Sequence, residues 1–171
     1  MEEKVQKIVE KLRLEPLVGE GGLFRQTYCS AEELRADQLP ARYKSAHPLG
    51  TVIYFLLTDD PDSFSVLHRL PTDEVYHFYL GDPVEMLLLH PDGRAEEIAL
   101  GSDILGGQQV QFVAPAHAWQ GSRLKPGGGF ALLGTTMAPG YIQEDFEAGR
   151  RADLLAQYPQ AAEQIKRLCR E

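Results

Sequence analysis

The chain of 171 residues carries a net charge of −8 and is 43% apolar and 25% charged, which is typical of one globular domain with a sizeable core. The acidic balance argues against a surface for nucleic acid or anionic membrane, because such a surface needs a basic stripe and the longest basic cluster is Arg150–Arg151. No apolar run approaches the roughly 20 residues of a membrane helix. From the charge and the absence of such a run we expect neither a nucleic-acid nor a membrane partner.

A helix is predicted at the start of the chain, in residues 1–14. Its apolar residues recur at helical spacing with charged residues between them: Val5, Ile8, Val9 and Leu12. The turn sequence EPLVGEGG, rich in glycine and proline, ends this helix. The charged first segment does not have the pattern of a signal peptide.

Strands are predicted from residue 23 to residue 138. Short segments rich in branched and aromatic residues follow one another, separated by Gly/Pro turn signals: LFRQTYCS, TVIYFLL, SFSVLHRL, EVYHFYL, VEMLLLH, AEEIAL, QVQFVAP and FALLGTTM. Close spacing of strands and turns favours antiparallel pairing in an all-β sandwich or barrel. Residues 144–171 turn helical again, and we expect two short helices to pack outside the β body of this single domain, 1–171.

The two cysteines, Cys29 and Cys169, are far apart in the sequence, and neither belongs to a CxxC pair. We interpret them as reduced thiols, which predicts a cytoplasmic protein.

The segment SVLHRLPTDEVYHFYLGD holds two histidines and a glutamate within ten residues: His68, Glu74 and His77. Such a cluster can hold a metal, transfer protons or pack a core. Alternate residues of a strand face opposite sides, so Glu74, Tyr76 and Phe78 share one face and His77 lies on the other.

These motifs resemble those of the cupin superfamily, whose first motif has the form H-x-H, then E, then G. Here His68, Glu74 and Gly81 keep that spacing, and PAHAWQ (115–120) stands in place of the second motif, P-x-G-x-x-H. The chain most resembles the uncharacterised DUF985, or cupin_5, branch over residues 12–158. The resemblance implies an all-β double-stranded β-helix, a jelly-roll barrel with short peripheral N- and C-terminal helices. It also implies a homodimer that binds a small-molecule ligand.

Metal-binding cupins typically use three histidines and one glutamate. In this chain Leu70 occupies the second histidine position and Gln120 the third. Leucine cannot coordinate a metal, and an amide is a poor ligand for Zn, Fe or Cu. We therefore expect no metal and no cofactor.

Three residues are candidate catalytic groups. His68 is either an acid–base group or a hydrogen-bonded core histidine. Glu74 needs a partner if it is buried, and a hydrogen bond to His68 would satisfy both side chains and fix the imidazole tautomer. Tyr76 has a hydroxyl that could donate a proton.

Further residues are candidate ligand-binding groups. Arg25 and Thr27 share a strand face, and Arg25 could clamp an anion or form an ordinary surface ion pair. Trp119 and Gln120 are expected near the barrel mouth, where an aromatic face beside an amide suits a ring-shaped ligand; packing is the alternative for Trp119 and for Phe78. The remaining candidates are Glu20, in its glycine-bracketed turn, and Ser65. We interpret three further histidines, in or beside turns, as surface residues: His47, His90 and His117, the last at the glycine position of the second motif.

Three functional hypotheses follow. The first is a metal-independent epimerase- or isomerase-like enzyme acting on a small polar or sugar-type metabolite. In it, His68 abstracts a proton next to a carbonyl, Glu74 orients His68, and Tyr76 donates from the other side. The second is a binding module without chemistry, and the third is a metal-dependent cupin with a degenerate site at His68, Glu74 and Gln120. The sequence does not separate the first two.

Overall fold

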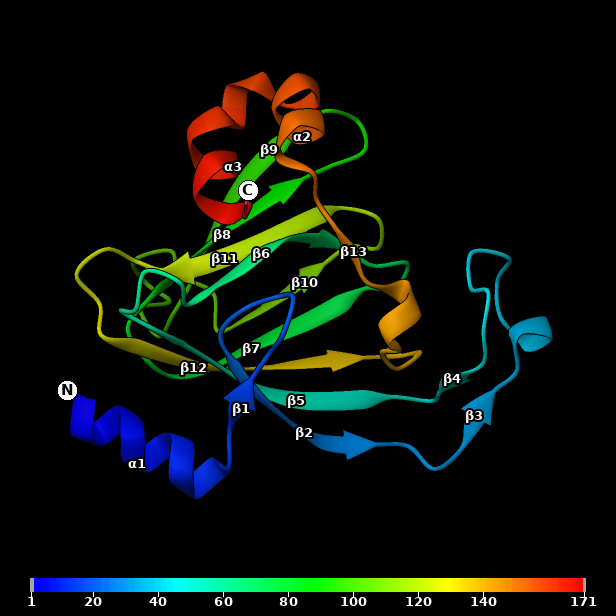
Figure 1. The fold of residues 1–171 in the computed structure, drawn as a ribbon, viewed down its shortest axis with the longest axis horizontal. Coiled ribbons are helices and arrows are strands. Elements are labelled where there is room, and N and C mark those ends of the chain that lie inside the picture. Colours follow the sequence, from blue (N-terminus) through cyan, green and yellow to red (C-terminus); the bar gives the residue numbers. More distant parts are fainter. Residues whose placement is uncertain (1, 171) are drawn as a thin grey trace.

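The computed structural model describes residues 2–170 (Figure 1). Within that range the strands form two main antiparallel sheets, six-stranded and five-stranded, which face each other. The six-stranded sheet has the order β1 (Glu15–Pro16), β2 (Leu23–Cys29), β5 (Thr51–Thr58), β12 (Phe130–Met137), β7 (Glu74–Gly81) and β10 (Gln111–Ala114). The five-stranded sheet has the order β13 (Glu147–Ala148), β6 (Phe64–Arg69), β11 (Trp119–Leu124), β8 (Val84–Leu89) and β9 (Ala95–Leu100).

This arrangement confirms the predicted jelly roll, although the two sheets do not join into one closed barrel. Neighbouring strands are distant in the sequence: β12 lies between β5 and β7, and β11 lies between β6 and β8. A two-stranded ribbon of β3 (Glu33–Leu34) and β4 (His47–Pro48) extends from one end of the molecule, with the short helix η1 (Ala36–Gln38) in its connection (Figure 1).

The main core lies between the two sheets and follows the alternation of the strands. In β7 the side chains of Glu74, Tyr76 and Phe78 are buried, whereas Val75 and His77 are half-buried on the outer face. The alternation ends after Phe78, where the pairing of β7 with β12 shifts at Tyr79. The inward side chains include Phe55, Leu57, Met86, Leu88, Leu100 and Leu133.

The helices at the two ends of the chain cover the outside of the sheets. Helix α1 (Glu2–Leu12) packs its apolar face against Leu56, Phe130 and Leu132. At the other end of the chain η2 (Gln143–Asp145), α2 (Arg151–Gln157), η3 (Pro159–Ala161) and α3 (Ala162–Leu168) follow. Helices α2 and α3 cover the outer face of the five-stranded sheet (Figure 1). Residues 1 and 171, the ends of the predicted segments, lie outside the described residues.

None of the helices in residues 2–170 is long and apolar enough to cross a membrane.

One prediction about the histidines is wrong. His47 was expected on the surface, but its side chain is fully buried and its Nε2 lies 2.7 Å from Oδ2 of Asp145. The burial depends on a partner that lies 98 residues further along the chain. His90 is partly buried beside Glu96, and His117 is exposed, in a left-handed turn with φ of 67°.

Candidate functional site

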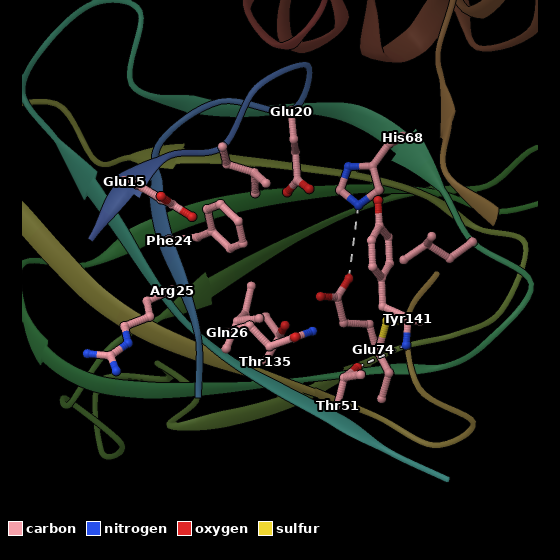
Figure 2. Close-up of a pocket in the computed structure, with 14 residues that line it drawn as sticks. Glu15, Glu20, Phe24, Arg25, Gln26, Thr51, His68, Glu74, Thr135 and Tyr141 are labelled. Carbon is pink, nitrogen blue, oxygen red and sulfur yellow. Dashed lines mark hydrogen bonds and ion pairs between the residues drawn. The ribbon is translucent and has the colours of Figure 1, made fainter. Parts of the chain in front are cut away.

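A pocket of about 370 Å³ opens between the two sheets (Figure 2). Its inner end is polar, with His68, Glu74 and Glu20 close together, and Glu15 and Arg25 lie at the opposite end. The lining residues are Glu15, Leu17, Glu20, Phe24, Arg25, Gln26, Thr51, Ile53, His68, Leu70, Glu74, Thr135, Met137 and Tyr141. An apolar wall with a few convergent polar groups is the usual composition of a small-molecule site.

His68 is held rigidly at the inner end of the pocket. Its backbone pairs with Gln120 on one side and Ala148 on the other, and its side chain is 2% exposed. Nδ1 donates a hydrogen bond to the carbonyl of Val66 at 2.8 Å, which fixes the ring and its tautomer. Phe146 stacks on the ring with a centroid distance of 5.1 Å. Nε2 is therefore the nitrogen that faces the pocket and Glu74 (Figure 2).

Glu74 joins a buried polar cluster with Gln120 and Tyr76. Its Oε2 accepts hydrogen bonds from Gln120 Nε2 at 2.7 Å and from the Tyr76 hydroxyl at 3.2 Å. His68 Nε2 lies 4.0 Å from the same oxygen and 3.3 Å from Gln120 Nε2. The amide of Gln120 thus lies between the imidazole and the carboxylate, and its own Oε1 is buried without a hydrogen-bond partner among the described residues.

Glu20 brings a second carboxylate to His68 from the turn that follows β1. The Ser65 hydroxyl donates to Glu20 Oε1 at 2.7 Å, and the Val66 amide donates to the Glu20 carbonyl at 3.0 Å. Gly21 follows with φ of 116°, and a Cβ at that position would collide with the carbonyl oxygen of Phe64. The turn therefore needs a glycine to lie close enough to β6 for Glu20 to reach the pocket.

The charges of this cluster favour a protonated imidazole. Burial lowers the pKa of His68, but the nearby Glu20 and Glu74 carboxylates outweigh burial and raise that pKa to about 9. Burial raises the pKa of Glu20, and repulsion from Glu74 raises it further, against the opposing effects of His68 and the Ser65 hydrogen bond. This pKa favours the imidazolium at neutral pH, a form that can give a proton, whereas in the neutral ring Nε2 accepts from Gln120 Nε2.

The structure adds Tyr141, which sequence reasoning missed, to the pocket wall. Its backbone amide donates to Thr51 Oγ1 at 2.9 Å, and its hydroxyl donates to Gln143 Oε1 at 3.1 Å. Burial and the carboxylates of Glu20 and Glu74 raise the pKa of Tyr141 to about 12. Its only sequence signal was its place in the stretch LLGTTMAPGYIQEDF, which carries the family resemblance. Four other polar lining residues were also missed: Glu15, Gln26, Thr51 and Thr135.

The residues predicted as catalytic and their neighbours are only partly assembled around the pocket. His68 and Glu74 line it, whereas Tyr76 is buried beneath Glu74 with a pKa well above its ordinary value, chiefly because of burial. Gln120 and Ser65 are absent from the lining, and each contacts it through a hydrogen bond to Glu74 or Glu20.

The other predicted ligand-binding residues are dispersed. Arg25 lines the pocket, but one of its guanidinium nitrogens donates to the carbonyl of Leu12 at 3.1 Å. Thr27 lies outside, where the pairing of β2 with β5 shifts, and it donates to the Val52 carbonyl. Phe78 packs in the main core. Trp119 packs beneath the C-terminal helices, with Arg69 over its ring at 4.5 Å.

The donor set around His68 does not suit a transition metal. Among the described residues, no three His, Cys, Asp or Glu side chains gather as metal ligands would. Leu70, buried on the pocket wall, offers no donor, and Gln120 directs its NH₂ group, which cannot coordinate, toward Glu74. A catalytic zinc site normally keeps three protein ligands, and of the four positions that hold the ligands in metal-binding cupins only His68 and Glu74 keep a histidine or glutamate. The Gln120 amide donates to the Glu74 carboxylate at 2.7 Å.

Comparisons with known proteins agree with this fold. The structure of protein SO0799 from Shewanella oneidensis superposes with a TM-score of 0.83 at 32% identity, covering 96% of each chain. The uncharacterized protein YML079W of Saccharomyces cerevisiae is 27% identical over 135 residues, which are 74% of this chain and 66% of the yeast protein. The chain thus spans slightly less than two thirds of that relative.

A more distant likeness concerns the fold alone. The oxalate decarboxylase of Bacillus subtilis superposes with a TM-score of 0.51 at 13% identity, over 91% of this chain and 37% of the enzyme. The family model of the Cupin superfamily (DUF985) matches residues 6–149. With its jelly-roll sheets, its pocket between them and this match, the chain belongs to the Cupin superfamily, in the DUF985 family.

Proposed function

We propose that the protein binds a small polar metabolite in the pocket between its sheets and transfers protons on it without a metal. The observation that carries this proposal is the position of His68: its imidazole meets the carboxylates of Glu20 and Glu74 at the inner end of a pocket of about 370 Å³. Titratable groups with perturbed pKa values in a cleft are typical of catalytic sites.

The charges favour an assignment of roles that reverses the one predicted from sequence. His68, whose pKa of about 9 favours its protonated form, is the general acid, and Glu20, whose pKa burial raises above its ordinary value, is the general base. Glu20 takes a proton from the carbon next to a carbonyl, while His68 Nε2 gives its proton to the carbonyl oxygen, which yields a neutral enol. Glu20 then gives its proton to the former carbonyl carbon while the neutral His68 takes the proton of the neighbouring hydroxyl, which completes an isomerisation and restores both side chains.

Two tyrosines support these roles in different ways. Tyr141 lines the pocket and contacts the ligand, whereas Tyr76 is a positioning residue that acts through its hydrogen bond to Glu74. The Glu74 carboxylate in turn places its Oε2 at 4.0 Å from His68 Nε2, where its negative charge faces the imidazole.

A deuterium wash-in experiment tests the proposal. The protein is incubated in D₂O with a panel of aldoses and ketoses, and exchange at the carbon next to the carbonyl is followed by NMR. We expect exchange with the wild type and a loss of about 100-fold or more in Glu20→Gln and in His68→Gln. His90→Gln, at the end of β8 and outside the pocket lining, is the control. Binding of a sugar without exchange would overturn the catalytic role and leave a non-catalytic binding module.

We further propose a cytoplasmic homodimer. The outer face of the six-stranded sheet carries part-exposed Tyr79 and Val113, and Tyr54 packs edge-on against Tyr79 at 6.0 Å. Association through sheets, as in other cupins, would cover these side chains. Light scattering should give twice the chain mass for the wild type and the monomer mass for Tyr79→Glu. Cys29 and Cys169 are free, which suits a reducing compartment.

A further inference from the structure

The pocket's inner end has hydrogen-bonding capacity that the protein does not use. Each of its two carboxylates has one oxygen occupied by protein donors: Glu20 Oε1 by Ser65, and Glu74 Oε2 by Gln120 and Tyr76. The other oxygens, Glu20 Oε2 and Glu74 Oε1, accept no hydrogen bond from residues 2–170. Both residues line the pocket, so a ligand meets two acceptors that require donors.

His68 supplies the complementary donor. In the imidazolium, Nδ1–H is bonded to Val66, and Nε2–H has Glu74 Oε2 at 4.0 Å, which is too far for a hydrogen bond. Gln120 Nε2, at 3.3 Å, donates to Nε2 only in the neutral ring, and it offers the imidazolium no acceptor. The inner end thus presents one donor between two acceptors.

The charge of the inner end limits what can bind there. A carboxylate or phosphate would meet two carboxylates at close range, where burial and, after it, repulsion from Glu74 already raise the pKa of Glu20. An ammonium group would meet the imidazolium of His68 and could not accept its proton. An uncharged group with an acceptor beside a donor satisfies all three side chains.

We propose, resting on the function proposed above, that the inner end recognises an uncharged α-hydroxycarbonyl group. Its carbonyl oxygen accepts from His68 Nε2, and its neighbouring hydroxyl donates to Glu20 Oε2 or Glu74 Oε1. The substrate class is therefore hydroxyketones, hydroxyaldehydes and open-chain sugars. Small carboxylates and phosphates are excluded from this end of the pocket.

Matched probes test this selectivity without any need for turnover. Dihydroxyacetone carries the uncharged group, glycolate replaces it with a carboxylate of similar size, and ethanolamine replaces it with an ammonium group. Binding is followed through the NMR signals of the His68 ring during titration. We expect dihydroxyacetone to shift these signals at concentrations at least tenfold below those at which glycolate or ethanolamine does.

Isosteric variants remove the charge and keep the shape. In Glu20→Gln/Glu74→Gln we expect dihydroxyacetone to bind at least tenfold more weakly and the preference over glycolate to disappear. If the double variant fails to fold, the single variant Glu20→Gln, at the half-buried carboxylate, replaces it. We expect it to show the same two changes as the double variant: weaker binding of dihydroxyacetone and a smaller preference for it over glycolate. Glu96→Gln, in a surface ion pair, is the matched control and should leave both unchanged.

Each outcome is decisive for one proposal. Preferential binding of glycolate or ethanolamine to the wild type, or absence of any shift by dihydroxyacetone, overturns the assigned ligand class. Selective binding of dihydroxyacetone without deuterium exchange of any sugar overturns the proposed catalysis and leaves the ligand class standing.

Discussion

Two histidine–carboxylate pairs are buried to a similar extent in this fold but are built differently. In the first, His47 Nε2 is 2.7 Å from Asp145 Oδ2, and Nδ1 donates to the Ser45 carbonyl at 2.9 Å. In the second, His68 Nε2 is 4.0 Å from Glu74 Oε2, and the pair lines a pocket. Every nitrogen of His47 has a partner within the protein, whereas one nitrogen of His68 has none suited to its protonated form.

The difference distinguishes a pair that stabilises the fold from a pair that can act on a ligand. The His47–Asp145 pair joins β4 to η2 and has no capacity left for a ligand. The His68–Glu74 pair is kept apart by Gln120, and its unused hydrogen-bonding groups face the pocket. A buried pair whose hydrogen-bonding groups all have partners within the protein is structural. A buried pair with unused hydrogen-bonding groups that face a pocket indicates a functional site.

The largest expected effect comes from breaking the complete pair. His47→Ala leaves the Asp145 carboxylate, which is 10% exposed, without its partner. We expect the free energy of unfolding in urea to fall by about 4 kcal/mol. His90→Ala, which breaks the more exposed pair with Glu96, is the control and should cost about 1 kcal/mol or less. Equal losses in the two variants would contradict the structural role given to His47.

The next effect is a pH dependence of stability that belongs to the incomplete pair. The pKa of His68 is about 9 in the folded protein and 6.5 ordinarily, so the folded state binds its proton more tightly. This contribution is fully present below pH 6.5 and is lost as the pH rises through 9, about 3 kcal/mol in all. Urea unfolding from pH 6 to 9.5 should show this decline in the wild type. A decline of the same size in His68→Gln would refute the assignment.

A smaller effect distinguishes the carboxylate of Glu74 from that of Asp145. Glu74→Gln removes one negative charge beside His68 and should lower the pKa of His68 by about 1 unit, toward 6.5. An NMR titration of the ring signals measures this change. Asp145→Asn should leave the His68 titration unchanged, because its partner is His47. A comparable change in both variants would mean that the two pairs are coupled.

The smallest effect concerns the ring that covers His68. Phe146→Leu keeps an apolar side chain but loses the stacked contact at 5.1 Å. We expect about 1 kcal/mol of lost stability, measured by urea unfolding at pH 7. No loss at all would mean that Phe146 does not support the imidazole.

Local patterns were enough to predict most of the fold and part of the site. The alternation in EVYHFYL correctly placed Glu74, Tyr76 and Phe78 inside and His77 outside, because β7 is regular up to Phe78. The same reasoning fails in β2 at Thr27, since the register shift between Gln26 and Tyr28 leaves Thr27 without a paired position opposite. A single inserted residue of this kind carries no signal in one sequence.

The parts of the site that could not be predicted depend on contacts between residues far apart in the sequence. Asp145 lies 98 residues from His47, and Glu20 lies 45 residues from Ser65. Nothing near His47 marks it as buried, and nothing near Tyr141 marks it as part of the pocket wall. The jelly-roll topology brings such groups together from distant parts of the chain, and the periodicity of the sequence does not reveal that topology.

The double pairing of the His68 backbone, with β11 on one side and β13 on the other, has a thermodynamic consequence. His68, Glu74 and Gln120 all lie on strands and hold their rotamers before a ligand arrives. Little conformational entropy remains to be lost from these three side chains on binding. The entropic cost of binding therefore falls on the Glu20 turn and on the ligand itself.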